Sequence, residues 1–171
     1  RLSWVGREIV LQLYQSGEIT VKQLSDETRQ IITAYNAASV ATVNDDGTPA
    51  VSPKATFVIL DDLTIAFGNI RSPGTQSNIE KRPEVELNFI DVLLRRAVRI
   101  KGRASVIDKS SKEGQELMPA FEALWAPYIN QMRNFIKIDI ENVQLIKSPA
   151  YDLGVTADEL KSLNLEKLNQ L

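Results

Sequence analysis

The sequence predicts a mainly β fold, in which six short antiparallel strands form a small barrel with helices at its periphery. From residue 38 onward, apolar residues recur at every second position, which is typical of strands that bury one face. Tight turns rich in Asp and Gly join the successive runs, so neighbouring strands are expected to be antiparallel. A parallel sheet is disfavoured, because its strands need long crossover connections. The 171 residues suffice for one domain with a single substantial core.

The composition excludes several kinds of chemistry. The chain contains no cysteine and no histidine, which excludes disulfides, thiolate catalysis, Ser-His-Asp triads and histidine-bound zinc. Carboxylate-only metal sites stay open as an option, although we assign none. Any redox reaction would need a bound organic cofactor, because no side chain here can carry it. A formal net charge of −2 without a basic tail gives no basis for nucleic-acid binding. No apolar stretch approaches the roughly 20 residues that span a bilayer, and no signal-peptide pattern is present, so we expect a cytoplasmic protein without a membrane partner.

Two helices are expected before the strands. The first covers residues 3–15, where apolar residues have helical spacing and Gly17 follows as a stop. The second begins at Thr20 and Gln23, which are spaced as a capping box, and continues to Tyr35. Such a pair also suggests a DNA-reading helix-turn-helix, but the near-neutral charge balance favours a helical cover over the main domain.

The first three strands form a meander. Residues 40–43 are the first strand, and Gly47 supplies the positive φ that a hairpin turn requires. Residues 50–60 return as the second strand, which Pro53 interrupts because proline cannot donate to the ladder and marks an edge or a bulge. A second Asp-rich turn leads to the third strand at residues 63–67.

The next elements alternate helix and strand. A short helix is expected over residues 75–81, ended by Arg82 and Pro83, and the fourth strand follows at residues 85–90. The fifth strand, residues 97–107, carries Gly102 at its centre, where a glycine indicates a bend or a close backbone approach.

The outward face of the fifth strand and the residues just before it are basic: Arg95, Arg96, Arg99, Lys101 and Arg103. Such a cluster is usually a solvated face, but it can also meet a phosphate or a partner subunit.

Helices and one more strand complete the chain. The pair Ser110 and Glu113 predicts a capped helix, which Pro119 and a later proline divide into short pieces. Residues 136–145 alternate as the sixth strand. The pair Thr156 and Glu159 opens a terminal helix. We therefore expect one domain over residues 1–171, with a helical N-terminal extension (1–36), a barrel with inserted helices (37–147) and a C-terminal tail and helix (148–171).

The loop at residues 69–78 is the first candidate binding site. It is rich in Ser, Thr and Gly and leads into a helix, so its free N–H groups and hydroxyls suit a phosphate. The plain alternative is that Ser72 or Thr75 only caps the following helix.

Lys54 and Trp125 are the other candidates. Lys54 lies beside Pro53, where a lysine either protects a sheet edge from aggregation or offers a fixed cation to an anionic ligand. Trp125 lies between two prolines, where its ring either stacks on a flat ligand or packs in the core.

Several stretches occur in a familiar order: VATV (40–43), DGTP (46–49), VSPK (51–54), IAFG (65–68), SNI (77–79), RPEV (82–85) and RIKGRA (99–104). Over residues 34–107, this set resembles the pyridoxamine 5′-phosphate oxidase-like family of FMN-binding split barrels. The stretch SPAYDLG (148–154) is similar to the tail of flavin-nucleotide-binding members. The resemblance implies a split β-barrel homodimer with FMN at the subunit interface.

The resemblance also implies which residues contact FMN. The strand along the flavin would provide Ser52, Lys54 and Ala55, and the neighbouring strand would end in Phe67, Gly68 and Asn69. The phosphate and ribityl chain would lie among Ser72, Thr75, Gln76 and Asn78. The partner subunit would add residues of the 95–99 region, including Arg96 and Arg99, and Trp125. No catalytic residue is assigned.

The chain departs from oxidases of this family in two places. Gly74 and Thr75 stand where the family's phosphate loop carries an Arg-Lys pair, and residues 164–171 lack the terminal Trp and basic residues that bind substrate. We therefore expect FMN to depend on Arg71, Lys54 and backbone amides. Three hypotheses follow: an FMN-dependent oxidoreductase with another substrate, a flavin module that carries or senses electrons, and a barrel used only for protein association.

Overall fold

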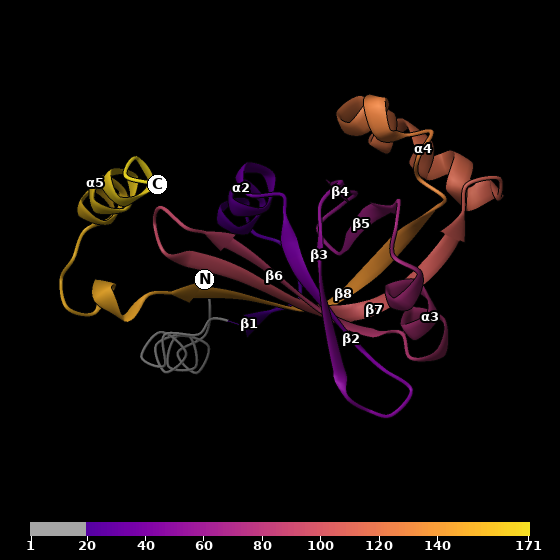
Figure 1. Ribbon diagram of the computed structural model, residues 1–171, viewed down its shortest axis with the longest axis horizontal. Helices are drawn as coiled ribbons and strands as arrows, with labels where there is room; N and C mark the ends of the chain where they lie inside the picture. The colour runs from indigo at the N-terminus through magenta and orange to yellow at the C-terminus, as the bar shows by residue number, and fades with distance from the viewer. Residues whose placement is uncertain (1–19) are drawn as a thin grey trace, which may run out of the picture.

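The computed structural model describes residues 20–171, so the helix expected at residues 3–15 lies outside the described part. Figure 1 shows long strands that run between helix α4 at one end and helix α5 at the other. The strands are β1 (Thr20–Val21), β2 (Ala38–Val43), β3 (Pro49–Lys54), β4 (Phe57–Ile59), β5 (Thr64–Asn69), β6 (Glu84–Asp91), β7 (Arg96–Asp108) and β8 (Asn134–Lys147). The helices are α2 (Asp26–Ala34), α3 (Pro73–Lys81), α4 (Lys112–Trp125) and α5 (Ala157–Leu168), with short 3-10 turns at Ala126–Tyr128 and Pro149–Tyr151.

All strands belong to one curled antiparallel sheet, in the order β3-β2-β6-β7-β8-β5-β4, and β1 pairs with β8. The mainly β class and the antiparallel pairing are therefore confirmed. The expected count of six strands is wrong: the described residues form eight, because β1 was expected to be helical and the segment 50–60 is two strands.

The junction between β3 and β4 explains this division. Pro53 does not interrupt β3, which stays paired with β2 through Lys54 and lies at the edge of the sheet, as a proline requires. The break falls at Thr56, whose φ of 60° is a strained value for a β-branched residue. The consecutive strands β3 and β4 therefore lie at opposite edges of the curled sheet. The Ala55–Thr56 link crosses the gap between these two edges, which we call the seam.

Long-range packing also moved the predicted helix boundaries. The helix expected from Thr20 begins only at Asp26, with Ser25 and Thr28 as its capping box, because Thr20 and Val21 pair with β8. The cap of α4 is Ser111 rather than Ser110, whose hydroxyl instead bonds the Asp108 carboxylate.

Helix α4 continues through Pro119. One missing helical hydrogen bond is tolerated there, because Phe121 stacks on Phe135 of β8 at 4.1 Å and holds the helix to the sheet. The prediction that Pro119 divides this helix is therefore wrong. The capping box of α5 at Thr156 and Glu159 is confirmed.

Two apolar clusters stabilise the fold. The larger one fills the curl of the sheet, where Phe67 and Phe89 both contact Phe57. The smaller one lies between α4 and strands β4, β5 and β8. Gly102 is confirmed as a close-approach position: a Cβ there would lie 2.4 Å from the Asp139 carbonyl oxygen, where the β7–β8 register shifts.

Candidate functional site

The first turn of α3 has backbone donors that no side chain uses. Ser72 is the N-cap residue but makes no side-chain hydrogen bond, whereas α2, α4 and α5 are all capped by a hydroxyl. Pro73 has no N–H group, so Gly74 and Thr75 carry the free donors of this turn. A Cβ at Gly74 would meet nothing within 4 Å, so the space beside these donors is open. The alternative that Ser72 caps α3 through its side chain is therefore wrong.

Helix α3 is held in place from its other end. The Asn78 amide donates to the Thr42 hydroxyl and to the Asn44 side chain, both at 3.0 Å. Lys81 and Arg82 each pair with Asp45 at 2.6 Å. Asn78 therefore fixes α3 against β2, and its amide donors are already used within the chain.

A cluster of side-chain amides lies where β5 meets α3. Asn69, which is 2% exposed, donates to Gln76 and to Asn134 of β8, both at 3.0 Å. Its Oδ1 is buried and has no hydrogen-bond partner among the described residues. An unsatisfied buried acceptor costs about 1–3 kcal/mol, which a ligand hydroxyl or a water would offset.

The N-terminal end of α3 borders a cavity of about 250 Å³. Its lining includes Asn69, Ser72, Gln76 and Arg133. The Arg133 guanidinium has no carboxylate partner among residues 20–171. Arg133 and Asn134 were not predicted as site residues. They lie more than 50 residues after the loop in sequence, and only the pairing of β5 with β8 brings them there.

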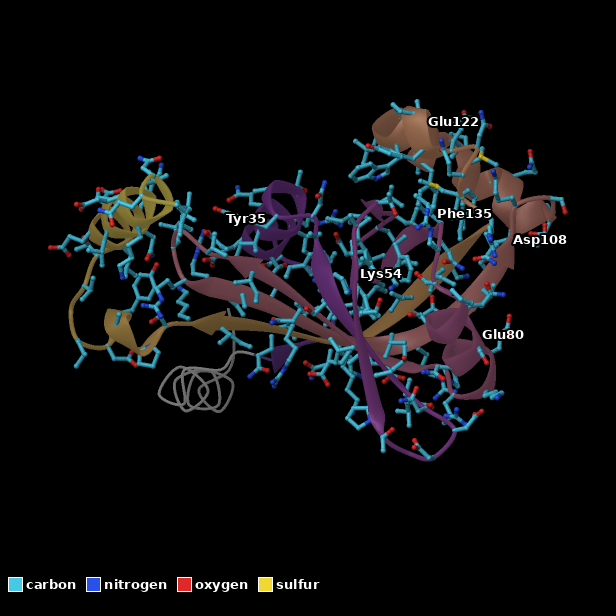
Figure 2. The ribbon with its side chains drawn as sticks, in the orientation of Figure 1. Tyr35, Lys54, Glu80, Asp108, Glu122 and Phe135 are labelled. Carbon is cyan, nitrogen blue, oxygen red and sulfur yellow. The ribbon has the colours of Figure 1, made fainter. Side chains whose placement is uncertain are left out.

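Lys54 lies at the end of the edge strand β3, opposite Ala38 of β2 (Figure 2). Its ammonium donates to the Ser52 hydroxyl and, at 3.4 Å, to the Pro53 carbonyl, and no carboxylate pairs with it in the described part of the chain. Burial lowers the pKa of the Lys54 side chain below its ordinary value. This half-buried cation therefore lacks an internal counter-ion.

The seam next to Lys54 brings together three of the other predicted residues. Ala55 is exposed, and the Thr56 hydroxyl donates to the Gly68 carbonyl at 2.9 Å, which ties the β3–β4 link to β5. Phe67 is fully buried in the core, so only its backbone is available to a ligand. A Cβ at Gly68 would overlap the flexible Met132 side chain, so Met132 packs directly against the glycine.

The basic residues of β7 that were predicted to contact FMN form ion pairs within the chain. Ala104 is the β7 residue whose N–H donates to the Pro83 carbonyl just after α3. Arg96 lies farther along the same strand, roughly 26 Å away at about 3.3 Å per residue. Arg96 pairs with Glu27 and with the buried Asp91, both at 3.0 Å. Arg99 is exposed and pairs with Glu86 at 3.2 Å.

Trp125 bonds the backbone of β4. Its Nε1 donates to the Phe57 carbonyl of β4 at 3.0 Å, so the indole is fixed at the end of α4. Arg71 is exposed at the start of the loop. The structure thus gathers the loop residues at one end of α3 and places Lys54 at the seam, whereas Arg96 and Arg99 pair with carboxylates of other elements and Trp125 bonds β4.

Comparison with known proteins identifies the family. A family model described as pyridoxamine 5′-phosphate oxidase matches residues 24–147. No curated protein matches the chain. None of the helices between residues 20 and 171 is long and apolar enough to cross a membrane.

Solved structures share the fold at low identity. A candidate pyridoxamine 5′-phosphate oxidase from Lactobacillus delbrueckii is 24% identical with a TM-score of 0.61, and the match covers 74% of this chain and 98% of that one. An FMN-binding protein from Syntrophomonas wolfei is 14% identical with a TM-score of 0.63, covering 83% and 95%. The heme storage protein HutZ from Vibrio cholerae is 19% identical with a TM-score of 0.54, covering 73% and 94%. At these identities the structures show a common fold, and because the family model spans more than half of the sequence, the chain belongs to the pyridoxamine 5′-phosphate oxidase-like family.

Proposed function

We propose that the protein is an FMN-binding flavoprotein that acts as an oxidoreductase, with residues 1–171 as one domain. Membership of a family that includes flavin proteins supports this proposal, as does the shared fold of a protein described as FMN-binding. The structural observation that carries the proposal is Lys54, a half-buried ammonium without a carboxylate partner in the described residues. A buried charge is unfavourable unless it is paired, and an anionic cofactor would provide the missing partner.

The residues around α3 fit a phosphate monoester. The Gly74 and Thr75 N–H groups are free and lie at the positive end of the helix dipole. The Ser72 and Thr75 hydroxyls add donors, and the exposed Arg71 adds charge close to this turn. The first turn of α3 contains no carboxylate, and the Glu80 carboxylate that lines the adjacent cavity accepts a hydrogen bond from the Gln76 amide at 2.7 Å.

The seam residues would contact the rest of the cofactor. Ser52 and Lys54 lie at the end of the edge strand β3 and Ala55 follows it, while Gly68 and Asn69 end β5 on the other side of the seam. The unsatisfied Asn69 Oδ1 would accept a hydrogen bond from a ribityl hydroxyl. When bound, FMN supplies hydride or single-electron transfer, and these side chains serve to hold and orient it.

We further propose a homodimer with FMN at the interface. The edge strand β3 exposes Val51 at 67%, and its unpaired side is available to a second copy. Arg99 is exposed and bonds Glu86 and Gln144 but no residue of α3, so a second copy would bring it to the cofactor. Arg96 is a poorer candidate for this role, because its two terminal nitrogens already pair with carboxylates, although its buried Nε has no partner among the described residues.

The alternatives differ in what the bound cofactor does. A flavin module that carries or senses electrons would use the same site without a substrate, and a barrel for protein association would leave the site empty. Heme binding is suggested by the shared fold of HutZ, but the absence of histidine removes the commonest axial ligand.

The visible spectrum of the purified protein is the first test. We expect flavin absorption bands, release of FMN on heating, and turnover of NADH or NADPH with an electron acceptor. A colourless protein that also fails to bind added FMN would contradict the proposal. A Soret band after titration with hemin, without any affinity for FMN, would assign the site to heme instead. Bound FMN without turnover would favour the electron-carrier alternative.

A further inference from the structure

A second cavity, separate from α3, lies between α2 and α4. Its volume is about 380 Å³, within the range of small-molecule sites. Its walls are apolar side chains of three elements, and three polar residues complete the lining: Ile32, Phe57, Ile59, Leu124 and Trp125, with Arg29, Thr33 and Asn36. We propose that this α2–α4 cleft binds a planar aromatic molecule without net charge.

The Trp125 ring is a fixed wall of the cleft. Its Nε1 donates to the Phe57 carbonyl at 3.0 Å, which sets the position of the indole relative to β4. One turn earlier on α4, the fully buried Phe121 stacks on Phe135 at 4.1 Å with an interplanar angle of 4°. The indole therefore offers a preformed surface, on which a flat aromatic ring gains stacking energy without ordering the protein.

The charge of the lining favours an uncharged ligand. Arg29 is the only ionisable residue among those that line the cleft, and Asp62 pairs with it. An ionised ligand would lose its hydration here without meeting an uncompensated opposite charge. The Thr33 and Asn36 side chains make no hydrogen bond to another described residue, so they can bond a carbonyl, hydroxyl or nitro group on the ligand.

The cleft is also close in sequence to the proposed cofactor site. Its floor, Phe57 and Ile59, belongs to β4, which begins three residues after Lys54. Binding of an aromatic molecule to the cleft does not depend on the proposed function. Electron exchange between this molecule and a flavin does rest on it.

Tryptophan fluorescence gives a direct test of binding. The chain has two tryptophans, so Trp4→Phe leaves Trp125 as the only indole. The probe is 1,4-naphthoquinone, titrated into flavin-free protein; the absence of cysteine prevents thiol adducts. We expect saturable quenching, and at least tenfold weaker binding of 1,4-naphthoquinone-2-sulfonate because of its charge.

Matched variants locate the probe. Thr33→Phe fills the cleft from α2 and should weaken binding at least tenfold, while Thr33→Ser should stay within twofold of the parent. Leu124→Phe fills the cleft from α4 and should give the same loss, and both sites are exposed, so folding is expected to be retained. Leu168→Ala, which removes an exposed leucine of α5, is the control outside the cleft.

The outcomes separate the two proposals. Saturable quenching that both filling variants abolish supports the cleft, even if the protein never binds FMN. Unsaturable quenching, equal binding of the sulfonate, or quenching unchanged in both filling variants overturns the cleft proposal, even if FMN binds. If the protein is confirmed to bind flavin, the redox role has its own test. The quinone should accelerate reoxidation of the reduced flavin, and Thr33→Phe should reduce this acceleration.

Discussion

Two buried or half-buried cations, Arg96 and Lys54, have opposite surroundings. Arg96 lies at the α5 end of the sheet and pairs with Glu27 and with Asp91, which is 2% exposed. Lys54 lies at the seam and bonds only a hydroxyl and a carbonyl. A charge that the fold compensates is part of the structure, whereas a charge that the fold leaves uncompensated is available to a ligand.

The surroundings of Asp91 make the same point. Burial raises the pKa of the Asp91 carboxyl, but hydrogen bonds from the Leu94 N–H, the Tyr35 hydroxyl and Arg96 outweigh that effect and lower it. The C-terminal tail is bonded to the loop that follows Asp91, because Asn164 and Tyr151 donate to the Leu93 and Leu94 carbonyls, respectively. Every charged group of this network thus has a partner, as expected for a structural role.

Removal of the buried carboxylate should have the largest effect. Asp91→Asn leaves the Arg96 guanidinium partly buried with only Glu27, so we expect a loss of about 3 kcal/mol in the free energy of unfolding. Urea denaturation measures this loss. Asp45→Asn, at an exposed ion pair, is the matched control and should change little. Equal small losses for both variants would contradict the structural role of Asp91.

Removal of the uncompensated cation should affect binding and leave folding intact. Lys54→Met should weaken FMN binding by about 1–3 kcal/mol, as expected for the loss of a hydrogen bond from a charged group. Because burial lowers the pKa of Lys54, the charged side chain does not stabilise the free protein, so its denaturation midpoint should not fall. Flavin fluorescence titration and urea denaturation measure the two quantities. Lys101→Met, at an exposed lysine of β7, is the control, and a loss of stability in Lys54→Met alone would assign Lys54 to the structural class.

A carboxylate at the uncapped helix should separate stability from binding. Ser72→Asp supplies the missing cap and favours the helix dipole, so we expect a gain of about 0.5–1 kcal/mol in the free energy of unfolding. The same carboxylate should repel a phosphate and weaken FMN binding about tenfold. Ser72→Ala controls for the hydroxyl. Unchanged FMN affinity in Ser72→Asp would place the phosphate elsewhere.

Two pH dependences of opposite sign are also expected. FMN affinity should fall as pH rises through the pKa of Lys54, which lies below the ordinary lysine value, and Lys54→Arg should remove this fall.

For Asp91 the folded pKa is lowered, so its contribution to stability is present above the unfolded pKa of about 3.9 and is lost as pH falls through the folded value. Acid titrations of wild type and Asp91→Asn should therefore converge at low pH. Parallel acid curves would contradict this assignment.

Local sequence determined most of the secondary structure. The alternation of residues 136–145 became β8, the glycine of the first hairpin has a φ of 82°, and the box at Thr156 and Glu159 caps α5. These features depend on side chains a few residues apart, so the sequence contains the information directly. The loop at α3 was recognisable for the same reason.

Partner choice across the sheet decided the rest. Thr20 has the spacing of a helix cap, but pairing with β8 makes it part of a strand. Nothing local marks Thr56 as the break between β3 and β4, because its hydroxyl bonds Gly68 twelve residues later. Likewise, only the β5–β8 ladder brings Arg133 and Asn134 beside Asn69, and only the packing of α2 and α4 around β4 forms the cleft at Trp125. The sequence alone therefore determined most of the strands, the position of the loop that leads into α3 and the family resemblance through short-range patterns. The tertiary structure alone decided which charges are compensated and which side chains share a cavity, because those relations join segments that are far apart along the chain.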